Sequence, residues 1–207
     1  MKPKVDFRRS FLRNLGTFRP IRKIGDVEFI FYHQIVEATV GKYSYGRLHV
    51  YSYQSKGTIE IGNFTSISEI NLILGGNHHR GLTTFPLKAR LLGNDASKDN
   101  DKISGIKIGH DCWIGFGVTI LDGVDVSTGS IIGAGSIVTK NTEPYGIYAG
   151  SPARKVKSRF DSELIERILL SKWWDATDKT ILSNIDQMYE SDPAKISRFL
   201  EDNVFQL

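Results

Sequence analysis

The chain of 207 residues lacks several features that define whole classes of protein. It has one cysteine, Cys112, which excludes an intramolecular disulfide framework and a cysteine-based metal cluster. It has no apolar run of about 18 residues, so we expect no transmembrane helix. Its amino terminus, MKPKVDFRRS, is basic but lacks the apolar stretch of a secretory signal. These absences favour a cytoplasmic protein.

Motifs for several other chemistries are also missing. His, Asp and Glu residues do not cluster at metal-ligand spacing, so we expect no metal site. The segment Gly133–Ala134–Gly135 is followed neither by the Gly-Lys-Ser/Thr of a phosphate-binding loop nor by the third glycine of a dinucleotide fingerprint. The basic residues show neither interleaved aromatics nor zinc-finger spacing, so we expect no nucleic-acid partner.

Positive charge is concentrated at the start of the chain. The net charge is +4, yet residues 1–23 contain eight Lys or Arg residues and one acidic residue, Asp6. The rest of the chain is therefore net negative. A basic arm of this kind is most often a solvated terminus, but it can also contact an anionic membrane surface. A peripheral membrane contact through residues 1–23 therefore stays open.

A six-residue repeat dominates the middle of the chain. An aliphatic residue occurs at every sixth position, and a small or β-branched residue follows four positions after each one. An α-helix would need apolar spacings of three and four, and an ordinary strand would alternate every two residues. The aliphatic positions are Ile108, Ile114, Ile120, Val126, Ile132 and Val138, and the small positions are Cys112, Val118, Val124, Ser130, Ser136 and Thr142.

This repeat predicts a triangular coil. Each six-residue unit supplies one short strand and one corner, so that three units, about 18 residues, close one turn. The aliphatic residue points inward and stacks on its equivalents in the coils above and below, while the small residue fills the narrow corner. The expected fold class is therefore mainly β, a solenoid of stacked parallel strands.

The repeat is interrupted once. The same spacing occurs earlier at Ile61, Ile67 and Ile73, with Val40 as a first rung, and it then stops until residue 108. The interval is rich in polar and turn-forming residues, and loops of this length in compact folds are usually functional or disordered. We expect a basic N-terminal arm at 1–35, and a β-helix domain at 36–150 with about four to five coils and an excursion loop at 74–107.

Helical spacing replaces the repeat after residue 150. Asp161 is a plausible helix N-cap, and three amphipathic stretches follow it. An open end of a solenoid must be covered. We therefore expect residues 151–207 to form a C-terminal helical cap over that end, with Trp173 and Trp174 as packing residues.

Three features together narrow the interpretation. They are the six-residue repeats, the segment NHHRGLTTFPL at 77–87, and the pattern SPAR…RFD…KWWD between residues 151 and 175. Together they resemble the xenobiotic acetyltransferases, which include the type B chloramphenicol and the streptogramin acetyltransferases. The resemblance implies a left-handed parallel β-helix, a homotrimer with active sites at subunit interfaces, and acetyl-CoA as co-substrate with no permanently bound cofactor.

The resemblance also implies a catalytic residue. The family's catalytic histidine opens the excursion loop, and His78 occupies that position. Acetyl transfer to a hydroxyl needs a base whose pKa is near neutral, which suits histidine. His79 competes with it, but neighbouring side chains on extended chain point to opposite sides. Cys112 occupies an inward position, so we expect a buried thiol and direct transfer rather than an acetyl-cysteine intermediate.

Donor contacts are implied by the same resemblance. In the superfamily the pantetheine arm of coenzyme A lies between two neighbouring solenoids, and residues 133–140 match the segment that contacts it. Lys and Arg residues would supply charge for the phosphates, although solvated surface charge is the alternative for each of them. The implied contacts are Gly117, Ala134, Ser136, Thr139, Lys140, Arg154 and Lys157.

The acceptor side departs from the family. Gly81 stands where the family usually has Asp, and Phe-Pro-Leu replaces Tyr-Pro-Phe at 85–87. The short segment Tyr43-Ser44-Tyr45-Gly46 looks like that of relatives among the polysaccharide and sugar O-acetyltransferases. The implied acceptor-binding residues are Tyr43, Tyr45, Asn77, Thr84 and Phe85.

These features lead to one functional hypothesis with two alternatives. We expect an acetyl-CoA-dependent O-acetyltransferase that acts on a sugar hydroxyl of a polysaccharide or its precursor, with His78 as general base. One alternative is an acetyltransferase that inactivates a hydroxyl-bearing antibiotic of the chloramphenicol or streptogramin type. The other is a non-catalytic trimeric β-helix scaffold, which would need neither the Asn-His pair nor the Thr-Lys pair at 139–140.

Overall fold

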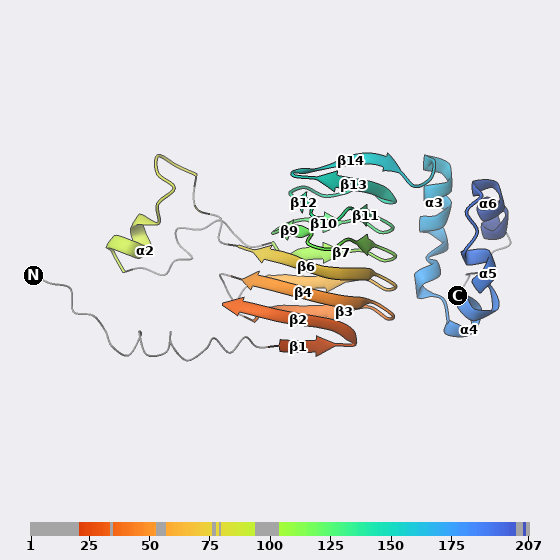
Figure 1. Ribbon diagram of the computed structural model, residues 1–207, viewed down its shortest axis with the longest axis horizontal. Coiled ribbons are helices and arrows are strands. Elements are labelled where there is room, and N and C mark those ends of the chain that lie inside the picture. The colour runs from red at the N-terminus through yellow and green to blue at the C-terminus, as the bar shows by residue number, and fades with distance from the viewer. Residues whose placement is uncertain are drawn as a thin grey trace, which may run out of the picture.

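The computed structural model describes residues 21–33, 35–52, 57–75, 78, 80–93, 104–201 and 205. It is a parallel-strand solenoid of about five turns with helices beside it (Figure 1). The strands are β1 (Ile21–Ile24), β2 (Asp26–His33), β3 (Glu37–Val40), β4 (Tyr45–Ser52), β5 (Thr58–Ile61), β6 (Ser66–Leu74), β7 (Ile106–Ile108), β8 (Trp113–Ile114), β9 (Thr119–Leu121), β10 (Asp125–Val126), β11 (Ile131–Ile132), β12 (Ile137–Val138), β13 (Gly146–Gly150) and β14 (Ala153–Ser158). The helices are α2 (Leu87–Leu91), α3 (Ser162–Ser171), α4 (Asp178–Ser183), α5 (Ile185–Met188) and α6 (Pro193–Glu201), with a 3₁₀ turn at Trp173–Asp175.

The strands stack into three faces. The first face contains β8, β11 and β13, the second contains β9 and β12, and the third contains β3, β5, β7 and β10. Strand β6 pairs in parallel with β8 through Ser66–Ile67 and with β9 through Asn71–Ile73. The long strands β2, β4 and β6 therefore run across both the first and the second face.

The interior confirms the inward positions of the repeat from Ile108 to Val138, whereas Ile73 is half-buried and Leu72 takes the inward position in register with Ile120. The six aliphatic side chains from Ile108 to Val138 are at most 2% exposed, and the small residues four positions after each are also buried. Burial of such a side chain contributes about 1.5–3 kcal/mol. A continuous apolar column therefore runs through the stack and fixes the register of the outer surface.

The solenoid begins earlier than the sequence boundary at residue 36. Strand β2 pairs with β4 in parallel register from Asp26 to His33. Its inward residues are Val27, Phe29 and Phe31, which alternate with a period of two. A strand that crosses two faces hides the six-residue spacing, so the repeat did not mark this coil.

Antiparallel strands lie at both ends of the stack. Strand β1 pairs antiparallel with β2, and β14 pairs antiparallel with β13. The last strand thus turns back along the final coil and places its residues beside it (Figure 1).

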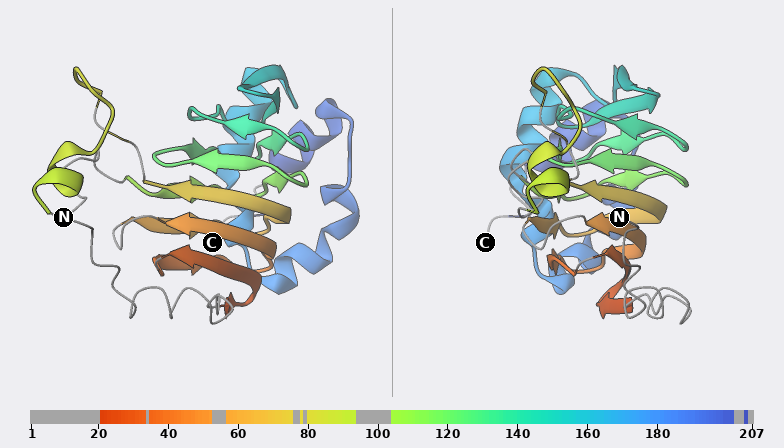
Figure 2. Two further views of the ribbon diagram at one scale, coloured as in Figure 1. Left: turned by 60° about the vertical axis from the view of Figure 1, so that its left-hand side comes forward. Right: turned by 90° about the vertical axis from the view of Figure 1, so that its left-hand side faces the viewer.

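The position of the C-terminal helices corrects the expectation of a cap over the open end. Figures 1 and 2 show α3 running alongside the stacked coils rather than across their end. The amide of Asn63 donates to the carbonyl of Trp174 at 2.9 Å, and Lys42 donates to the carbonyl of Ala176 at 2.5 Å. These polar contacts come from turns of successive coils, so the helices cover one edge of the prism. Within the described residues, no helix has the length and apolar character needed to cross a membrane.

Candidate functional site

The excursion loop leaves the solenoid at the edge between the second and third faces. It follows β6, and its return to β7 is held by Asp122, whose carboxylate accepts hydrogen bonds from the backbone N–H groups of Ser104 and Gly105 at 2.9–3.3 Å. Figure 2 shows helix α2 of this loop standing away from the coils. Because both ends are anchored on rigid strands, the loop projects from a fixed base.

His78 lies just beyond the end of β6, and its side chain is exposed. Its Nδ1 is 2.7 Å from the carbonyl oxygen of Thr84. A carbonyl can only accept, so Nδ1 carries the ring proton and Nε2 keeps its lone pair. This contact orients the imidazole, and the sequence did not indicate it because it depends on the path of the loop. Asn77 and His79 lie outside the described residues.

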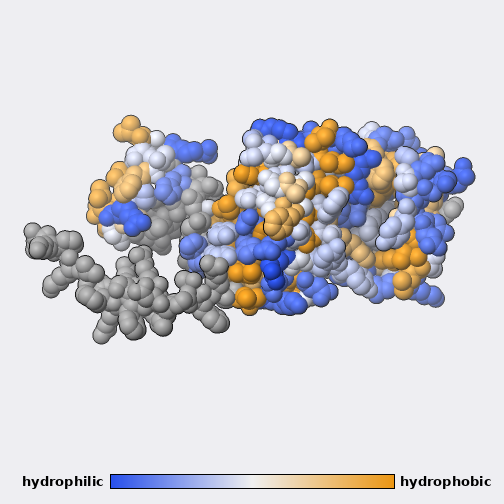
Figure 3. Space-filling view, viewed as in Figure 1, coloured by the Kyte–Doolittle hydropathy of each residue, from blue (hydrophilic) through white to orange (hydrophobic). Residues whose placement is uncertain are grey.

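The excursion carries an apolar surface. Leu82, Phe85, Leu87, Leu91 and Leu92 are all exposed, and α2 has no buried residue. Figure 3 shows hydrophobic side chains gathered over this part of the molecule. An exposed apolar cluster of this kind marks an interaction site more often than a solvated loop.

The implied acceptor-binding residues fall into two groups. Thr84 and Phe85 are exposed on the excursion beside His78. Tyr45 begins β4 and Tyr43 lies in the turn before it, whereas His78 follows the end of the parallel strand β6, so one chain places them at opposite ends of the strands. The hydroxyl of Tyr43 donates to Asp178 at 2.6 Å, beside the C-terminal helices.

The implied donor contacts border the second face. Gly117 and Ala134 lie at its edge with the first face, where the Gly135 N–H donates to the carbonyl of Phe116 in the coil below. Thr139 and Lys140 follow β12 at the other edge, from which the excursion also departs. Ala134, Thr139 and Lys140 are exposed, and Gly117 is half-buried.

Arg154 and Lys157 lie on β14. Arg154 pairs with Ala149, which stacks over Gly133 at the edge that carries Ala134. Lys157 pairs with Ile147, nearer the other end of the first face. Both side chains are exposed. Arg154 is therefore the basic residue of this pair closer to the edge of the second face.

Ser136 is placed differently from the other implied donor contacts. Its side chain is fully buried, and its hydroxyl donates to the carbonyl of Gly133 at 2.6 Å and accepts from the N–H of Gly150 at 3.1 Å. The hydroxyl thus closes a corner of the coil and does not face the outer surface.

Cys112 is a buried thiol, as the repeat indicated. It is 2% exposed, and burial raises its pKa to about 12. A thiol in this state is a weak nucleophile, since only the thiolate attacks. No group of three or more His, Cys, Asp or Glu side chains in the described part of the chain is arranged to hold a metal ion.

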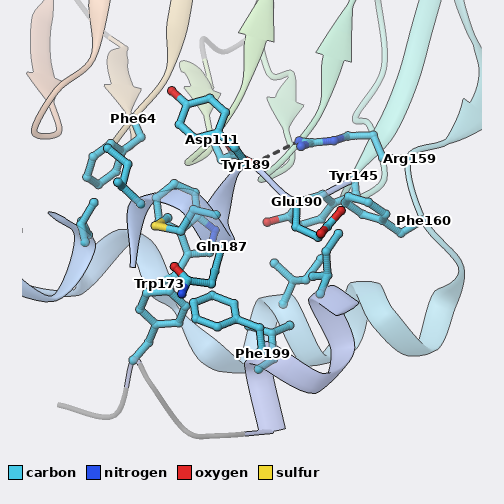
Figure 4. A pocket seen from close by; sticks show the side chains of 17 residues that line it. Phe64, Asp111, Tyr145, Arg159, Phe160, Trp173, Gln187, Tyr189, Glu190 and Phe199 are labelled. Atoms are coloured by element: carbon cyan, nitrogen blue, oxygen red, sulfur yellow. Dashed lines mark hydrogen bonds and ion pairs between the residues drawn. The ribbon is translucent and has the colours of Figure 1, made fainter. Parts of the chain in front are cut away.

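A cavity of about 440 Å³ lies between the solenoid and the C-terminal helices (Figure 4). Arg159 donates to Asp111 at 3.0 Å in its wall and lies over the rings of Tyr145 and Phe160. Trp173 also lines it, and Trp174 is buried against His110. The cavity is on the edge that carries the helices, so the Arg-Phe and Trp-Trp residues attach the helices to the coils rather than surround His78.

Comparison with known proteins gives relatives of one kind. The chain is 39% identical over 135 residues to a probable macrolide acetyltransferase of Lysinibacillus sphaericus, covering 61% of this chain and 74% of that protein. It is 32% identical over 183 residues to a chloramphenicol acetyltransferase of Agrobacterium fabrum, covering 77% and 86%. No family model matches the sequence.

Solved structures of similar proteins are more distant. A hexapeptide-repeat acetyltransferase from Vibrio cholerae is 22% identical, with a TM-score of 0.49 over 64% of this chain and 74% of that one. The same protein has also been solved with acetyl coenzyme A, with a TM-score of 0.47 and 19% identity over 64% of this chain and 72% of that one.

Proposed function

The chain belongs to the xenobiotic acetyltransferase family of hexapeptide-repeat acetyltransferases, and from this membership we propose that it transfers the acetyl group of acetyl-CoA to a hydroxyl of a sugar. The sugar belongs to a polysaccharide or to its precursor. Transfer is direct, within a complex that holds donor and acceptor together, and His78 is the general base.

The geometry of His78 carries this proposal. The carbonyl of Thr84 fixes the tautomer in which Nε2 can accept a proton, and the side chain is exposed at the base of the loop. A neutral imidazole with a fixed tautomer is suited to general-base catalysis at neutral pH. A merely structural histidine needs no exposed position of this kind.

The proposed step conserves atoms and charge. Nε2 of His78 takes the hydroxyl proton as the acceptor oxygen attacks the thioester carbonyl, and the C–S bond then breaks. The coenzyme A thiolate leaves and receives the proton from the imidazolium, which regenerates the neutral base. The buried Cys112 thiol supports direct transfer, because its high pKa makes an acetyl-cysteine unfavourable.

The donor is proposed to lie along the second face. Gly117 and Ala134 at one edge and Thr139 and Lys140 at the other border a flat wall of short strands. Flat backbone suits the weakly polar pantetheine arm, and the exposed ammonium of Lys140 and guanidinium of Arg154 suit its phosphates. Lys157 provides further positive charge on β14.

An antibiotic acceptor is the second candidate function. It is favoured by the names of the relatives, a probable macrolide acetyltransferase and a chloramphenicol acetyltransferase. A sugar is favoured by the departures at Gly81 and at 85–87 and by the short segment at Tyr43–Gly46.

A panel of acceptors separates the two candidates. Purified protein is mixed with acetyl-CoA and a thiol reagent, and methyl glycosides, chloramphenicol, a streptogramin or a macrolide are added in turn. We expect release of free coenzyme A only with the glycosides, because they carry the sugar hydroxyls that we propose as acceptors. Release only with an antibiotic would overturn the sugar proposal and support the second candidate.

Replacement of the proposed base tests the mechanism. We expect His78→Ala to lower kcat by at least about 100-fold, since a general base contributes about 10²–10⁴-fold. The measurement is coenzyme A release under saturating donor, with circular dichroism to show that the fold is retained.

A matched control separates the loss of the proposed base from a general effect of changing the excursion loop. Arg90→Ala changes an exposed residue of α2 on the same excursion and should leave kcat within a factor of about two, as surface substitutions usually do. A His78→Ala variant with kcat near that of the Arg90→Ala variant would remove His78 from the reaction.

A further inference from the structure

A hydrogen-bonded array connects three successive coils on the outer side of the solenoid. The hydroxyl of Tyr32 is 3.0 Å from Nδ1 of His49, and Nε2 of His49 is 2.6 Å from Oε1 of Glu69. These residues come from β2, β4 and β6, which are neighbours in the sheet. They are 17 and 20 residues apart, so only the register of the coils brings them together.

The register places this array on the outer surface. Leu48, Val50, Ile70 and Leu72 are fully buried, and side chains alternate along a strand. The residues that alternate with them, Arg47 and His49 in β4 and Glu69 in β6, therefore point outward. His49 remains 20% exposed, Glu69 41% and Arg47 52%. The array is a half-open surface and not part of the core.

Protons in the array can be assigned from its chemistry. The Glu69 carboxylate accepts, so Nε2 of His49 carries the ring proton and Nδ1 accepts from the hydroxyl of Tyr32. The hydrogen bond from His49 lowers the pKa of Glu69, which keeps this carboxylate ionised. His49 thus joins an anion to a phenol and fixes the direction of the Tyr32 ring.

Beside this array lie an arginine and an aromatic stack. Nε of Arg47 donates to Glu28 at 2.8 Å, and its Nη1 is 3.7 Å from Oε2 of Glu69. The rings of Tyr32 and Tyr51 are stacked with centroids 4.4 Å apart and an interplanar angle of 16°. The surface therefore combines a carboxylate, a guanidinium and an ordered aromatic pair.

The array also borders the proposed reaction site. The backbone carbonyl of Glu69 accepts from the N–H of Gly117, which is one of the proposed donor contacts. Tyr51 is in register with Ile73, near the end of the strand that leads to His78. In the coils above, the same outward positions are Thr119 and Ile137. The second face is thus polar and aromatic in its lower coils and apolar to weakly polar in its upper ones.

We infer that the lower part of the second face binds the acceptor as a neutral pyranose, with Glu69 and Arg47 on its hydroxyls and the Tyr51–Tyr32 stack against its C–H face. This inference rests on the proposed function and names the acceptor class for it. Hydroxyls donate to Glu69 and accept from Arg47, and an aromatic face packs on the apolar side of a sugar ring. His49 is a positioning residue, because it acts through Glu69 and Tyr32.

Charge decides between classes of sugar. Glu28 and Glu69 lie on both sides of Arg47, so this surface carries one more negative than positive group when His49 is neutral. A uronic acid or a sugar diphosphate would be repelled, whereas a neutral hexoside meets both donors and acceptors. The charge of this surface therefore favours a neutral sugar ring as the acceptor.

The test separates acceptor binding from folding. Glu69→Gln and Tyr51→Ala are assayed with acetyl-CoA and methyl glucoside, methyl galactoside or methyl N-acetylglucosaminide. We expect the acceptor KM to rise at least about tenfold in both variants, because Glu69→Gln removes a hydrogen bond to a charged group and Tyr51→Ala removes the ring that packs on the sugar. The acetyl-CoA KM should stay within a factor of about two. A purely structural role would change both Michaelis constants together.

Controls and a binding measurement complete the experiment. Glu60→Gln removes a carboxylate that pairs with Lys107 at 3.3 Å on the third face, and Tyr189→Ala removes an exposed ring on the helical side. Both should leave the acceptor KM unchanged. Saturation-transfer NMR of the methyl glycoside with His78→Ala protein should show binding that Glu69→Gln and Tyr51→Ala abolish in the same background.

The outcomes distinguish the two proposals. If wild-type protein acetylates a glycoside and both variants keep its acceptor KM, the inference is wrong and the sugar acetyltransferase stands. If no glycoside binds or reacts while an antibiotic is acetylated, the sugar function falls and this surface loses its proposed ligand with it. Tighter binding of glucuronic acid than of methyl glucoside would also overturn the inference.

Discussion

At the scale of single residues, the buried edge beside the helices contains one titratable ring whose charge state matters. Nδ1 of His110 accepts from the backbone N–H of Asn63 at 2.9 Å, and the ring stacks on Trp174 with centroids 5.0 Å apart. Burial lowers the pKa of His110 from 6.5, and Asp175 opposes this only in part. The neutral ring is therefore the form that the fold accommodates.

Stability should consequently fall in mildly acidic solution. Between about pH 6.5 and the lower pKa of the native state, His110 is protonated in the unfolded chain but not in the native chain. Protonation therefore favours unfolding in this range of pH. We expect the free energy of unfolding to decrease between pH 7 and pH 5. Urea titrations across this range should show a smaller decrease for His110→Asn. An equal decrease in both proteins would show that His110 does not cause it.

At the scale of elements, the corners of the coils limit which residues can be tolerated. Gly129 has a φ of +74°, and a Cβ there would lie 2.5 Å from the ring of Tyr145. Gly135 has nearly the same φ, +70°, with open space around it. The two glycines form a matched pair in which the backbone is the same and the packing differs.

Alanine at these two corners should separate backbone strain from packing. Gly135→Ala should cost about 1–2 kcal/mol, the usual penalty for a left-handed conformation. Gly129→Ala should cost about 1–3 kcal/mol more, because the buried ring of Tyr145 has to move. Chemical denaturation of both variants measures the difference. Equal losses would mean that the edge beneath the helices is loosely packed.

The same elements show how far the sequence predicts the fold. In the upper coils each six-residue unit makes its own strand and corner, so the local pattern predicted the inward residues correctly. Strand β2 crosses two faces, and its alternation at Val27, Phe29 and Phe31 concealed the first coil. The amphipathic helices were recognised, but amphipathicity does not say which surface a helix covers. The contact between Asn63 and Trp174, 111 residues apart, decides it.

The candidate site also has features that the sequence predicts and features that only the fold determines. The motif predicted His78 as the catalytic residue, but its contact with the carbonyl of Thr84 follows from the loop path and has no sequence pattern. The pairing of His49 with Glu69 was also missed, since it depends on register between β4 and β6. The matching segment predicts Ser136 as a donor contact, but its position in the repeat indicates an inward side chain, and the structure buries it fully.

At the scale of the whole molecule, one chain does not assemble all the proposed acceptor contacts. Tyr45 and His78 lie toward opposite ends of the parallel strands, and the excursion carries exposed apolar residues away from its own coils. A neighbouring chain seated against the excursion would cover these residues. It could also bring its own Tyr45 toward the first chain's His78. These features fit the homotrimer that the family resemblance implies, so we expect a mass of about three times 23.2 kDa by sedimentation, with sites shared between neighbours.

Mixing two inactive variants tests the sharing of sites directly. His78→Ala and Tyr45→Ala chains, each inactive alone, are co-expressed with different tags and the mixed trimers are purified. If each site takes His78 from one chain and Tyr45 from its neighbour, about a third of the interfaces in the purified mixed trimers carry both intact residues, because a cyclic trimer has heterologous interfaces. Activity should recover to about that fraction of wild type, whereas either variant expressed alone should stay inactive. Mixed trimers without recovery would place both residues in the same chain's site, a Tyr45→Ala protein that is active alone would remove Tyr45 from the site, and a monomeric wild-type protein would refute the shared site altogether.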